Sequence, residues 1–242
     1  TEESNLITSL WQGAWAAAWL VGALVWGLIA AAVVLFRRRK SDVGLPAQVR
    51  YNVPIEVLYT TVPIVVVLFY FVFTARDQER LLRVDEKPDN RIEVIGKRWS
   101  WDFNYLDAQV FETGIPGKPP TLYLPRGESV RFDLASRDVI HSFWAPAFLF
   151  KLDVFPGRTN TFQVTPTKTG KFAGKCAELC GVDHSRMLFT VEVVEPAEFD
   201  RYLQDLRDRG QVGRLPADNG PSRDPRTASD TDSQSGESGE DE

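Results

Sequence analysis

Side chains that bind transition metals are scarce in this chain. Its 242 residues include two histidines, two cysteines and one methionine. Two cysteines allow at most one disulfide, which excludes a disulfide-rich scaffold. An excess of positive charge is also lacking. The net charge of -5 is accounted for by residues 221–242, with seven acidic residues and two arginines, so the remainder is neutral and gives no support for nucleic-acid binding.

One long segment lacks charge altogether. Residues 14–36 form an uncharged run that is long enough to cross a bilayer. The tryptophans at positions 11, 15 and 19 are typical of the membrane interface. Four basic residues, 37–40, follow at once and place this end of the span in the cytoplasm by the positive-inside rule. A buried core helix is the alternative, but the length of the run and the basic stop both favour a membrane span.

A second, shorter apolar run covers residues 57–73 and predicts a span over about 54–75. It contains Pro63, which membrane helices tolerate when neighbours satisfy the freed backbone group. The connection between the runs is short, so they are expected to form an antiparallel hairpin. Residues 1–89 are thus predicted to be a two-pass anchor in a bacterial cell membrane. Both termini, and everything that follows the hairpin, would lie on the outer side.

After the hairpin, the pattern changes to alternating residues of the β-forming type. Trp99, Trp101, Phe103 and Tyr105 alternate cleanly. Gly and Pro turn signals bound five further short runs: 121–124, 130–134, 161–164, 171–175 and 188–194. Such punctuation predicts a β-sandwich or barrel over residues 90–195.

The C-terminal part has two sections. Pro196 opens a short amphipathic helix that is predicted over residues 196–210. Residues 211–242 are rich in Ser, Asp, Gly and Pro and cannot bury enough apolar surface to order themselves, which predicts a disordered acidic tail. The predicted fold class is a membrane-anchored all-β protein with a C-terminal helix and a disordered tail.

The scarce soft and imidazole side chains are concentrated in one place. Cys176, Cys180, His184 and Met187 fall within twelve residues, and His141 stands apart on an apolar stretch. Thiolate, thioether and imidazole together suit copper better than other common metals. A disulfide leaves both histidines unexplained, and a Cys2His2 zinc site leaves Met187 unexplained.

A blue-copper site is the third interpretation, but it needs only one cysteine. Two thiolates can instead bridge two copper ions. Such a pair would share one electron with little change in each bond, because the charge is spread over two metals and two sulfurs. The array then predicts a site that passes on single electrons. Such a site does not bind a substrate and needs no open coordination position on the metal.

This array resembles the binuclear copper site of cytochrome c oxidase subunit II. The resemblance runs from the first span to about residue 202. It includes the aromatic segment 99–101, the segment 138–144 with Asp-Val-Ile-His-Ser-Phe-Trp, and Lys-Leu-Asp at 151–153 followed by Pro-Gly-Arg at 156–158. It implies a cupredoxin-like Greek-key β-sandwich in residues 90–195.

The resemblance also implies roles for individual residues. Six of them would be copper ligands: Cys176 and Cys180 bridging both ions, His141 and Met187 on one ion, and His184 and the backbone carbonyl of Glu178 on the other. The Glu178 carboxylate would point towards a magnesium shared with subunit I. Trp99 resembles the exposed tryptophan at which cytochrome c delivers its electron. Glu56 matches the carboxylate at the mouth of a proton channel into subunit I.

The implied function is that of subunit II of a cytochrome c oxidase. Electrons from cytochrome c would reach haem in subunit I, where oxygen is reduced and protons are pumped. The implied partners are subunit I, subunit III, membrane lipid and a cytochrome c that is soluble or membrane-bound. Five acidic residues are candidates for a surface that binds a basic cytochrome: Asp102, Asp107, Asp138, Asp153 and Asp183. The alternatives are the copper subunit of a related nitric oxide reductase and a membrane-tethered copper carrier.

Overall fold

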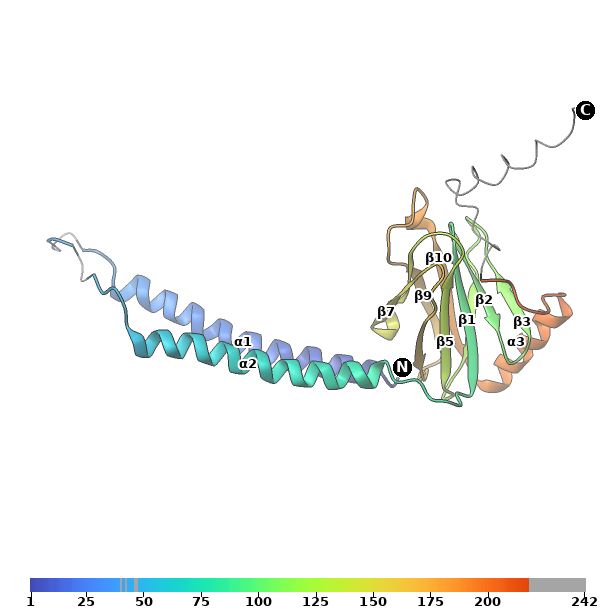
Figure 1. Cartoon of the computed structure of the whole chain (residues 1–242), viewed down its shortest axis with the longest axis horizontal. Helices are drawn as coiled ribbons and strands as arrows, with labels where there is room; N and C mark the ends of the chain where they lie inside the picture. The colour runs from blue at the N-terminus through green and yellow to red at the C-terminus, as the bar shows by residue number, and fades with distance from the viewer. Residues whose placement is uncertain (40, 42, 46–47, 218–242) are drawn as a thin grey trace, which may run out of the picture.

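Two long helices carry a separate β domain (Figure 1). The computed structural model describes residues 1–39, 41, 43–45 and 48–217. Helix α1 (Ser4–Leu35) and helix α2 (Val53–Leu81) lie side by side, and the Tyr70 hydroxyl donates a hydrogen bond to the Gly13 carbonyl. Both helices are long and apolar enough to cross a membrane.

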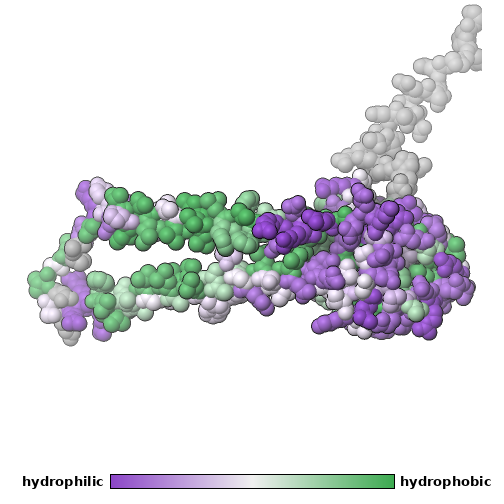
Figure 2. Space-filling model, turned by 90° about the horizontal axis from the view of Figure 1, so that it is seen from below, coloured by the Kyte–Doolittle hydropathy of each residue, from purple (hydrophilic) through white to green (hydrophobic). Residues whose placement is uncertain are grey.

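The surface of the two helices is apolar over most of its length (Figure 2). Neither helix buries any residue against the rest of the chain. A helix that is hydrophobic all round requires apolar surroundings, and a bilayer supplies them. The chain is therefore a membrane protein.

The β domain consists of two five-stranded sheets. The first has the strand order β3-β2-β1-β5-β8, and the second has the order β4-β10-β9-β6-β7. The strands of the first sheet are β1 (Asn90–Lys97), β2 (Ser100–Tyr105), β3 (Val110–Thr113), β5 (Val130–Ser136) and β8 (Asn160–Val164). Those of the second are β4 (Thr121–Pro125), β6 (His141–Ala145), β7 (Phe150–Val154), β9 (Gly170–Cys176) and β10 (Leu188–Val194).

Pairing within the sheets is mixed. Strand β1 runs antiparallel to β2 and parallel to β5, and β10 runs parallel to β4 and antiparallel to β9. Helix α3 (Pro196–Asp208) follows β10 and buries Phe199 and Leu206. Two apolar helices, a two-sheet sandwich and a C-terminal helix confirm the predicted fold class.

Aromatic side chains fill the space between the sheets. The rings of Phe132 and Phe162 stack with centroids 4.9 Å apart, and those of Phe143 and Phe189 stack at 4.7 Å. Strand β5 shows why the sequence folds this way, because its residues alternate between buried and half-buried along the whole strand. The buried Trp101 lies at one end of this core. Its ring centroid is 6.1 Å from that of His141, so the core packs directly against a candidate metal ligand.

The alternation pattern did not predict three of the strands, β3, β6 and β7. Strand β6 is buried at four of its five positions and β3 has only four residues, so neither shows a clear period of two. Strand β7 is mainly half-buried and follows β6 through the short helix η1 (Pro146–Phe148). The omission of β6 matters most, since this strand carries His141.

The predicted disordered tail begins too early. Residues 211–217 are described and lie across the outer face of the first sheet, whereas residues 218–242 lie outside the described chain. Arg214 forms two hydrogen bonds to the Glu93 carboxylate, at 2.6 and 2.8 Å. The Leu215 amide donates to the Asn104 side chain, which donates back to the Leu215 carbonyl. Residues 211–217 are ordered because Glu93 and Asn104 are buried polar groups that need hydrogen-bond partners.

Replacement of Arg214 by Ala is expected to destabilise the β domain by about 1–3 kcal/mol, because it removes a charged partner from a buried carboxylate. Thermal unfolding of the full chain in detergent measures the loss. The matched control is Arg126→Ala, which breaks the exposed ion pair with Glu195 and should lower the unfolding temperature much less, because solvent screens an exposed pair. Equal unfolding temperatures for the two variants would contradict a stabilising role of the 211–217 segment.

Candidate metal centre

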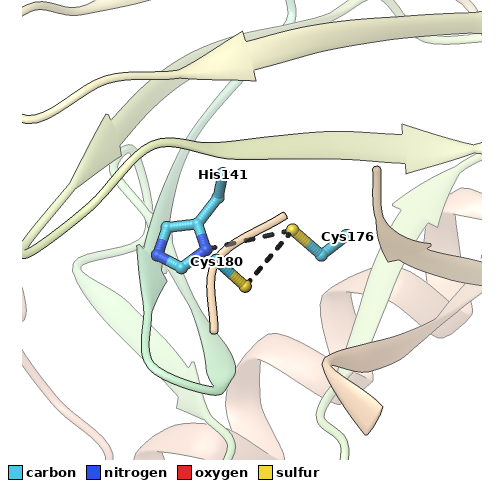
Figure 3. A group of neighbouring side chains, drawn as sticks. All are labelled: His141, Cys176 and Cys180. Atoms are coloured by element: carbon cyan, nitrogen blue, oxygen red, sulfur yellow. Dashed lines mark hydrogen bonds between the residues drawn. The ribbon is translucent and has the colours of Figure 1, made fainter. Parts of the chain in front are cut away.

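The candidate metal ligands meet at one end of the sandwich. Cys176 is the last residue of β9, and the loop to β10 carries Cys180, His184 and Met187. His141 begins β6, which is paired with β9 through Phe143 and Cys176. This pairing brings His141 to the cysteines although 35 residues separate it from Cys176 (Figure 3).

The two thiol sulfurs are the centre of the cluster. The Sγ atoms of Cys176 and Cys180 are 3.9 Å apart, and both cysteines are free. A disulfide requires about 2.05 Å between the sulfurs. Two metal–sulfur bonds of about 2.3 Å each can span the observed separation. The spacing therefore fits a metal held between two thiolates and excludes a disulfide in this structure.

Nitrogen, oxygen and sulfur donors surround the thiols on two sides. On the Cys176 side, the His141 Nδ1 atom lies 3.9 Å from Sγ and the Glu178 carbonyl oxygen lies 3.2 Å from it. On the Cys180 side, the His184 Nδ1 and Met187 Sδ atoms lie 3.6 Å and 3.7 Å from Sγ. The six predicted ligands thus come together in one place.

The arrangement differs from that of a single tetrahedral zinc. The ligand atoms of His141, Cys176 and Cys180 all lie within 4.8 Å of one another, but His184 does not belong to this group. The two imidazoles approach different sulfurs, and Met187 adds a thioether that zinc rarely uses. Two thiolates, two imidazoles and a thioether form a donor set that is consistent with copper.

His141 is oriented by a carboxylate that the sequence analysis assigned to a different role. The Asp138 Oδ1 atom lies 2.8 Å from the His141 Nε2 atom. A proton on Nε2 satisfies this bond and leaves the Nδ1 lone pair directed at Cys176. Metal-binding histidines commonly carry such a carboxylate partner. The only sequence signal for it is an Asp three residues before the His in the segment 138–144.

Burial and hydrogen bonding oppose each other at Asp138. Burial raises its pKa, but hydrogen bonds from His141 and from the backbone amides of Arg98 and Val139 lower it to about 2. Burial lowers the pKa of His141, and the Asp138 carboxylate more than restores it, so the net direction is upward. Asp138 is therefore an anion at neutral pH and holds the imidazole in one orientation.

The thiols do not ionise together. Burial raises the pKa of Cys176, but hydrogen bonds with His141 and with the backbone at Glu178 and Ser142 lower it to about 7. Burial and the neighbouring Cys176 raise the pKa of Cys180 to about 12. Ionisation of one thiol therefore opposes ionisation of the other, and a cation between them would offset this repulsion. This demand for positive charge supports the metal interpretation.

Two glycines allow close approach to the cluster. A Cβ atom at Gly96 would lie 2.8 Å from the His141 ring, so only glycine leaves room for this imidazole. Gly181 has a φ of +127°, and a Cβ there would lie 3.0 Å from the Trp99 ring. These positions were not singled out from the sequence, because nothing local distinguishes them from turn glycines.

Trp99, in the turn before β2, and Trp101, in β2, lie in different surroundings. Trp101 is fully buried, and its indole N–H donates a hydrogen bond of 3.5 Å to the Met187 carbonyl. Trp99 is half-buried, and its indole N–H donates a hydrogen bond of 3.1 Å to the Cys180 carbonyl. Trp99 therefore links the surface of the domain to the loop that carries the ligands.

Glu56 is far from this cluster. It lies in the first turn of α2, at the end of the hairpin away from the β domain (Figure 1). Its carboxylate accepts a hydrogen bond of 2.9 Å from the Asn52 amide, and the Asn52 side chain accepts one from the Ile55 amide. The two bonds cap the start of α2, as in other helices that begin with reciprocal side-chain caps.

The predicted acidic surface is wrong in part. Asp102 is completely buried and pairs with Lys97 at 2.6 Å and with Arg137 at 3.1 Å. Asp138 faces His141, as described above. The other three residues belong to separate parts of the surface, and two of them are in exposed ion pairs: Asp107 with Arg91, and Asp183 with Arg186. An acidic residue in a strand can thus be buried when neighbouring basic side chains neutralise its charge.

Residues 119–194 match the family model for the periplasmic domain of cytochrome c oxidase subunit II. A probable cytochrome c oxidase subunit 2 of Streptomyces avermitilis is 49% identical over 255 residues, which covers 90% of this chain and 80% of the relative. The chain belongs to the cytochrome c oxidase subunit II family.

Other members of the family are more distant. The cytochrome c oxidase subunit 2 of Mycobacterium tuberculosis is 35% identical over 266 residues, which covers 86% of this chain and 73% of that protein. The crystal structure of the periplasmic domain of oxidase subunit II from Bradyrhizobium japonicum covers 52% of this chain and 99% of that one, with 32% identity and a TM-score of 0.48.

Membership of the cytochrome c oxidase subunit II family confirms the resemblance found in the sequence. The β domain is the cupredoxin-like periplasmic domain of this family, and the chain is a subunit of a larger oxidase. The cluster of His141, Cys176, Cys180 and Met187 is consistent with the copper site of such a domain.

Replacement of Asp138 by Asn is expected to weaken copper binding by about 10- to 100-fold, because loss of an outer carboxylate releases the orientation of a metal-binding histidine. Copper titration of the full chain with a competing chelator measures the change. Asp153→Asn on the neighbouring strand β7 is the control and should leave the affinity unchanged. Wild-type affinity in Asp138→Asn would show that the His141 ring needs no support from this carboxylate.

Proposed function

We propose that this subunit II accepts electrons from cytochrome c at a pair of copper ions and delivers them to haem in subunit I, where oxygen is reduced and protons are pumped. The observation that carries the proposal is the convergence of four further donors, from His141, Glu178, His184 and Met187, on the two thiols. A single metal site would need fewer ligands. The chain's own contribution is to hold these donors and to connect them to the surface.

Each of the six donors has a proposed role. The thiolates of Cys176 and Cys180 would each contact both copper ions. His141 and Met187 would complete one copper, and His184 and the Glu178 carbonyl would complete the other. Copper bound in this way would supply a one-electron carrier. The packed core behind Trp101 limits movement of the ligands, which keeps the cost of changing charge small.

Trp99 is the proposed site of electron entry. Its half-buried indole reaches the Cys180 carbonyl through one hydrogen bond, so a donor that touches the ring is connected to a ligand residue by a short path. Asp138, which pairs with Arg98, orients the imidazole of His141 beside this path.

Two further roles concern subunit I. Glu178 is exposed, so its carboxylate is free to contact a magnesium ion that subunit I shares, while its carbonyl faces Cys176. Glu56 is proposed as the proton-channel entrance. Its place at the end of the hairpin opposite the β domain supports this role, because protons for oxygen reduction would be taken up on the cytoplasmic side.

A copper carrier is the competing function. Carriers exchange their metal, and this requires accessible ligands. Here His141 and Met187 are fully buried, and both cysteines are at most 6% exposed. Burial of this extent favours a resident metal centre over a transfer site.

Replacement of Cys180 by Ser is expected to abolish the electron paramagnetic resonance signal of a copper pair that shares one unpaired electron, because one bridging thiolate is lost. The copper content of the full chain should fall below two ions per chain. Met187→Leu is the comparison variant, since it keeps both thiols and should retain two copper ions with a changed redox potential. An unchanged spectrum in Cys180→Ser would exclude the bridging assignment.

Replacement of Trp99 by Phe is expected to slow electron input from cytochrome c by roughly 10- to 100-fold, the range that loss of precise positioning costs at a reacting site. The variant keeps an aromatic ring but loses the hydrogen bond to Cys180. Stopped-flow reduction of the assembled oxidase measures the rate, and copper content should not change. Trp26→Phe, in the middle of α1, serves as the control. Unaltered input in Trp99→Phe would place the entry point elsewhere.

A further inference from the structure

One completely buried carboxylate belongs to the β domain but not to the candidate metal ligands. The side chain of Asp102, in β2, is 0% exposed. Its neighbours in the strand, Trp101 and Phe103, are part of the core between the sheets, so Asp102 points to the opposite, outer face of the first sheet. Burial of a carboxylate is costly unless cations pair with it. The partners of Asp102 therefore indicate which parts of the fold this charge holds together.

Two cations from two different turns pair with this carboxylate. The Lys97 ammonium lies 2.6 Å from Oδ1, and the Arg137 guanidinium lies 3.1 Å from Oδ2. Lys97 ends β1 and begins the tight turn that carries Trp99. Arg137 follows β5, in the turn that carries Asp138 and leads to β6. Movement of either turn would leave a buried charge without its partner, so Asp102 holds both turns in place.

The two turns are also bonded to each other. The Arg137 amide donates a hydrogen bond of 3.0 Å to the Gly96 carbonyl. The Arg98 amide donates one of 2.7 Å to the Asp138 carboxylate. The Arg137 side chain has a further contact, because its Nε atom donates to the Pro216 carbonyl at 2.8 Å. The turn before β2 is thus braced by the turn before β6, and the buried carboxylate connects the two by charge.

The indole of Trp99 occupies a narrow space that depends on the position of its turn. Its N–H donates a hydrogen bond of 3.1 Å to the Cys180 carbonyl. A Cβ atom at Gly181 would lie 3.0 Å from the ring, so the ring packs directly against the backbone of the ligand loop. A small displacement of the turn would break this hydrogen bond, because its strength falls steeply with angle and distance.

We infer that Asp102 is a positioning residue for Trp99. It acts through Lys97 and Arg137, whose turns keep the indole on the Cys180 carbonyl. Asp102 itself takes no part in binding the metal or in passing the electron. The consequence for electron entry rests on the proposed function, whereas the position of the indole does not, so the two can be tested separately.

Fluorine NMR of the full chain in detergent, labelled with 5-fluorotryptophan and kept reduced, tests the position of the indole. Trp99→Phe identifies the resonance of Trp99. Asp102→Asn keeps the shape of the side chain but removes its charge. The Trp99 resonance should then shift and broaden, while those of the other tryptophans stay in place. Lys97→Met removes only the cation of the Trp99 turn and should have the same effect, which keeps the test valid if Asp102→Asn does not fold.

The matched control is Thr113→Val. The Thr113 hydroxyl donates a hydrogen bond of 2.6 Å to Oδ1 of Asp102, the oxygen that also pairs with Lys97. Thr113 belongs to β3 and to neither turn, so its replacement disturbs the buried network but leaves both ion pairs. The Trp99 resonance should keep its wild-type position in this variant.

Electron input provides the second measurement. In the assembled oxidase, Asp102→Asn and Lys97→Met should slow reduction by cytochrome c by roughly 10- to 100-fold, the range that misplacement of a reacting group costs. The copper content should stay at the wild-type level. Thr113→Val should be reduced at the wild-type rate.

Two outcomes would overturn the inference. An unmoved Trp99 resonance in both Asp102→Asn and Lys97→Met would show that this carboxylate does not position the indole. Equal changes in Thr113→Val would show that any loss within the buried network loosens the β domain. A shifted resonance with unchanged electron input, in Asp102→Asn and in Trp99→Phe alike, would support the positioning role and contradict electron entry through Trp99.

Discussion

The metal centre depends on one electrostatic constraint, the placement of two thiols 3.9 Å apart inside a packed domain. Burial and the neighbouring Cys176 raise the pKa of Cys180, so a cation between the two sulfurs would favour its ionisation beside Cys176. The loop that joins β9 to β10 fixes this spacing. Every other ligand is arranged around it, with His141 on the Cys176 side and His184 and Met187 on the Cys180 side.

The surroundings of the cluster reduce its freedom to move. The Asp138 carboxylate holds one imidazole, Gly96 leaves just enough room for it, and the aromatic core packs behind it through Trp101. Such rigidity would suit the proposed electron transfer, because little rearrangement is needed when the charge of a metal centre changes. The same contacts explain how a short ligand loop with three of its residues in the helix η2 (His184–Arg186) can keep a defined geometry.

Charge close to the metal centre is neutralised within the β domain. Close to Trp99, the carboxylates of Asp102 and Asp138 are each paired with basic residues or with a histidine, so neither is free for a partner. The charges of these carboxylates therefore serve contacts inside the domain.

The sequence by itself determined the membrane spans, most of the strands and the chemistry of the ligands. Uncharged length, alternation of apolar residues and the scarcity of Cys, His and Met are local properties, and each can be seen without knowing how the chain folds. Only the tertiary structure decided which distant groups meet. The pairing of β6 with β9 brings His141 to Cys176, Asp102 is buried beneath basic side chains, and residues 211–217 find buried partners in Glu93 and Asn104. These outcomes depend on contacts across strands and sheets, and such contacts leave no periodic signal in the chain itself.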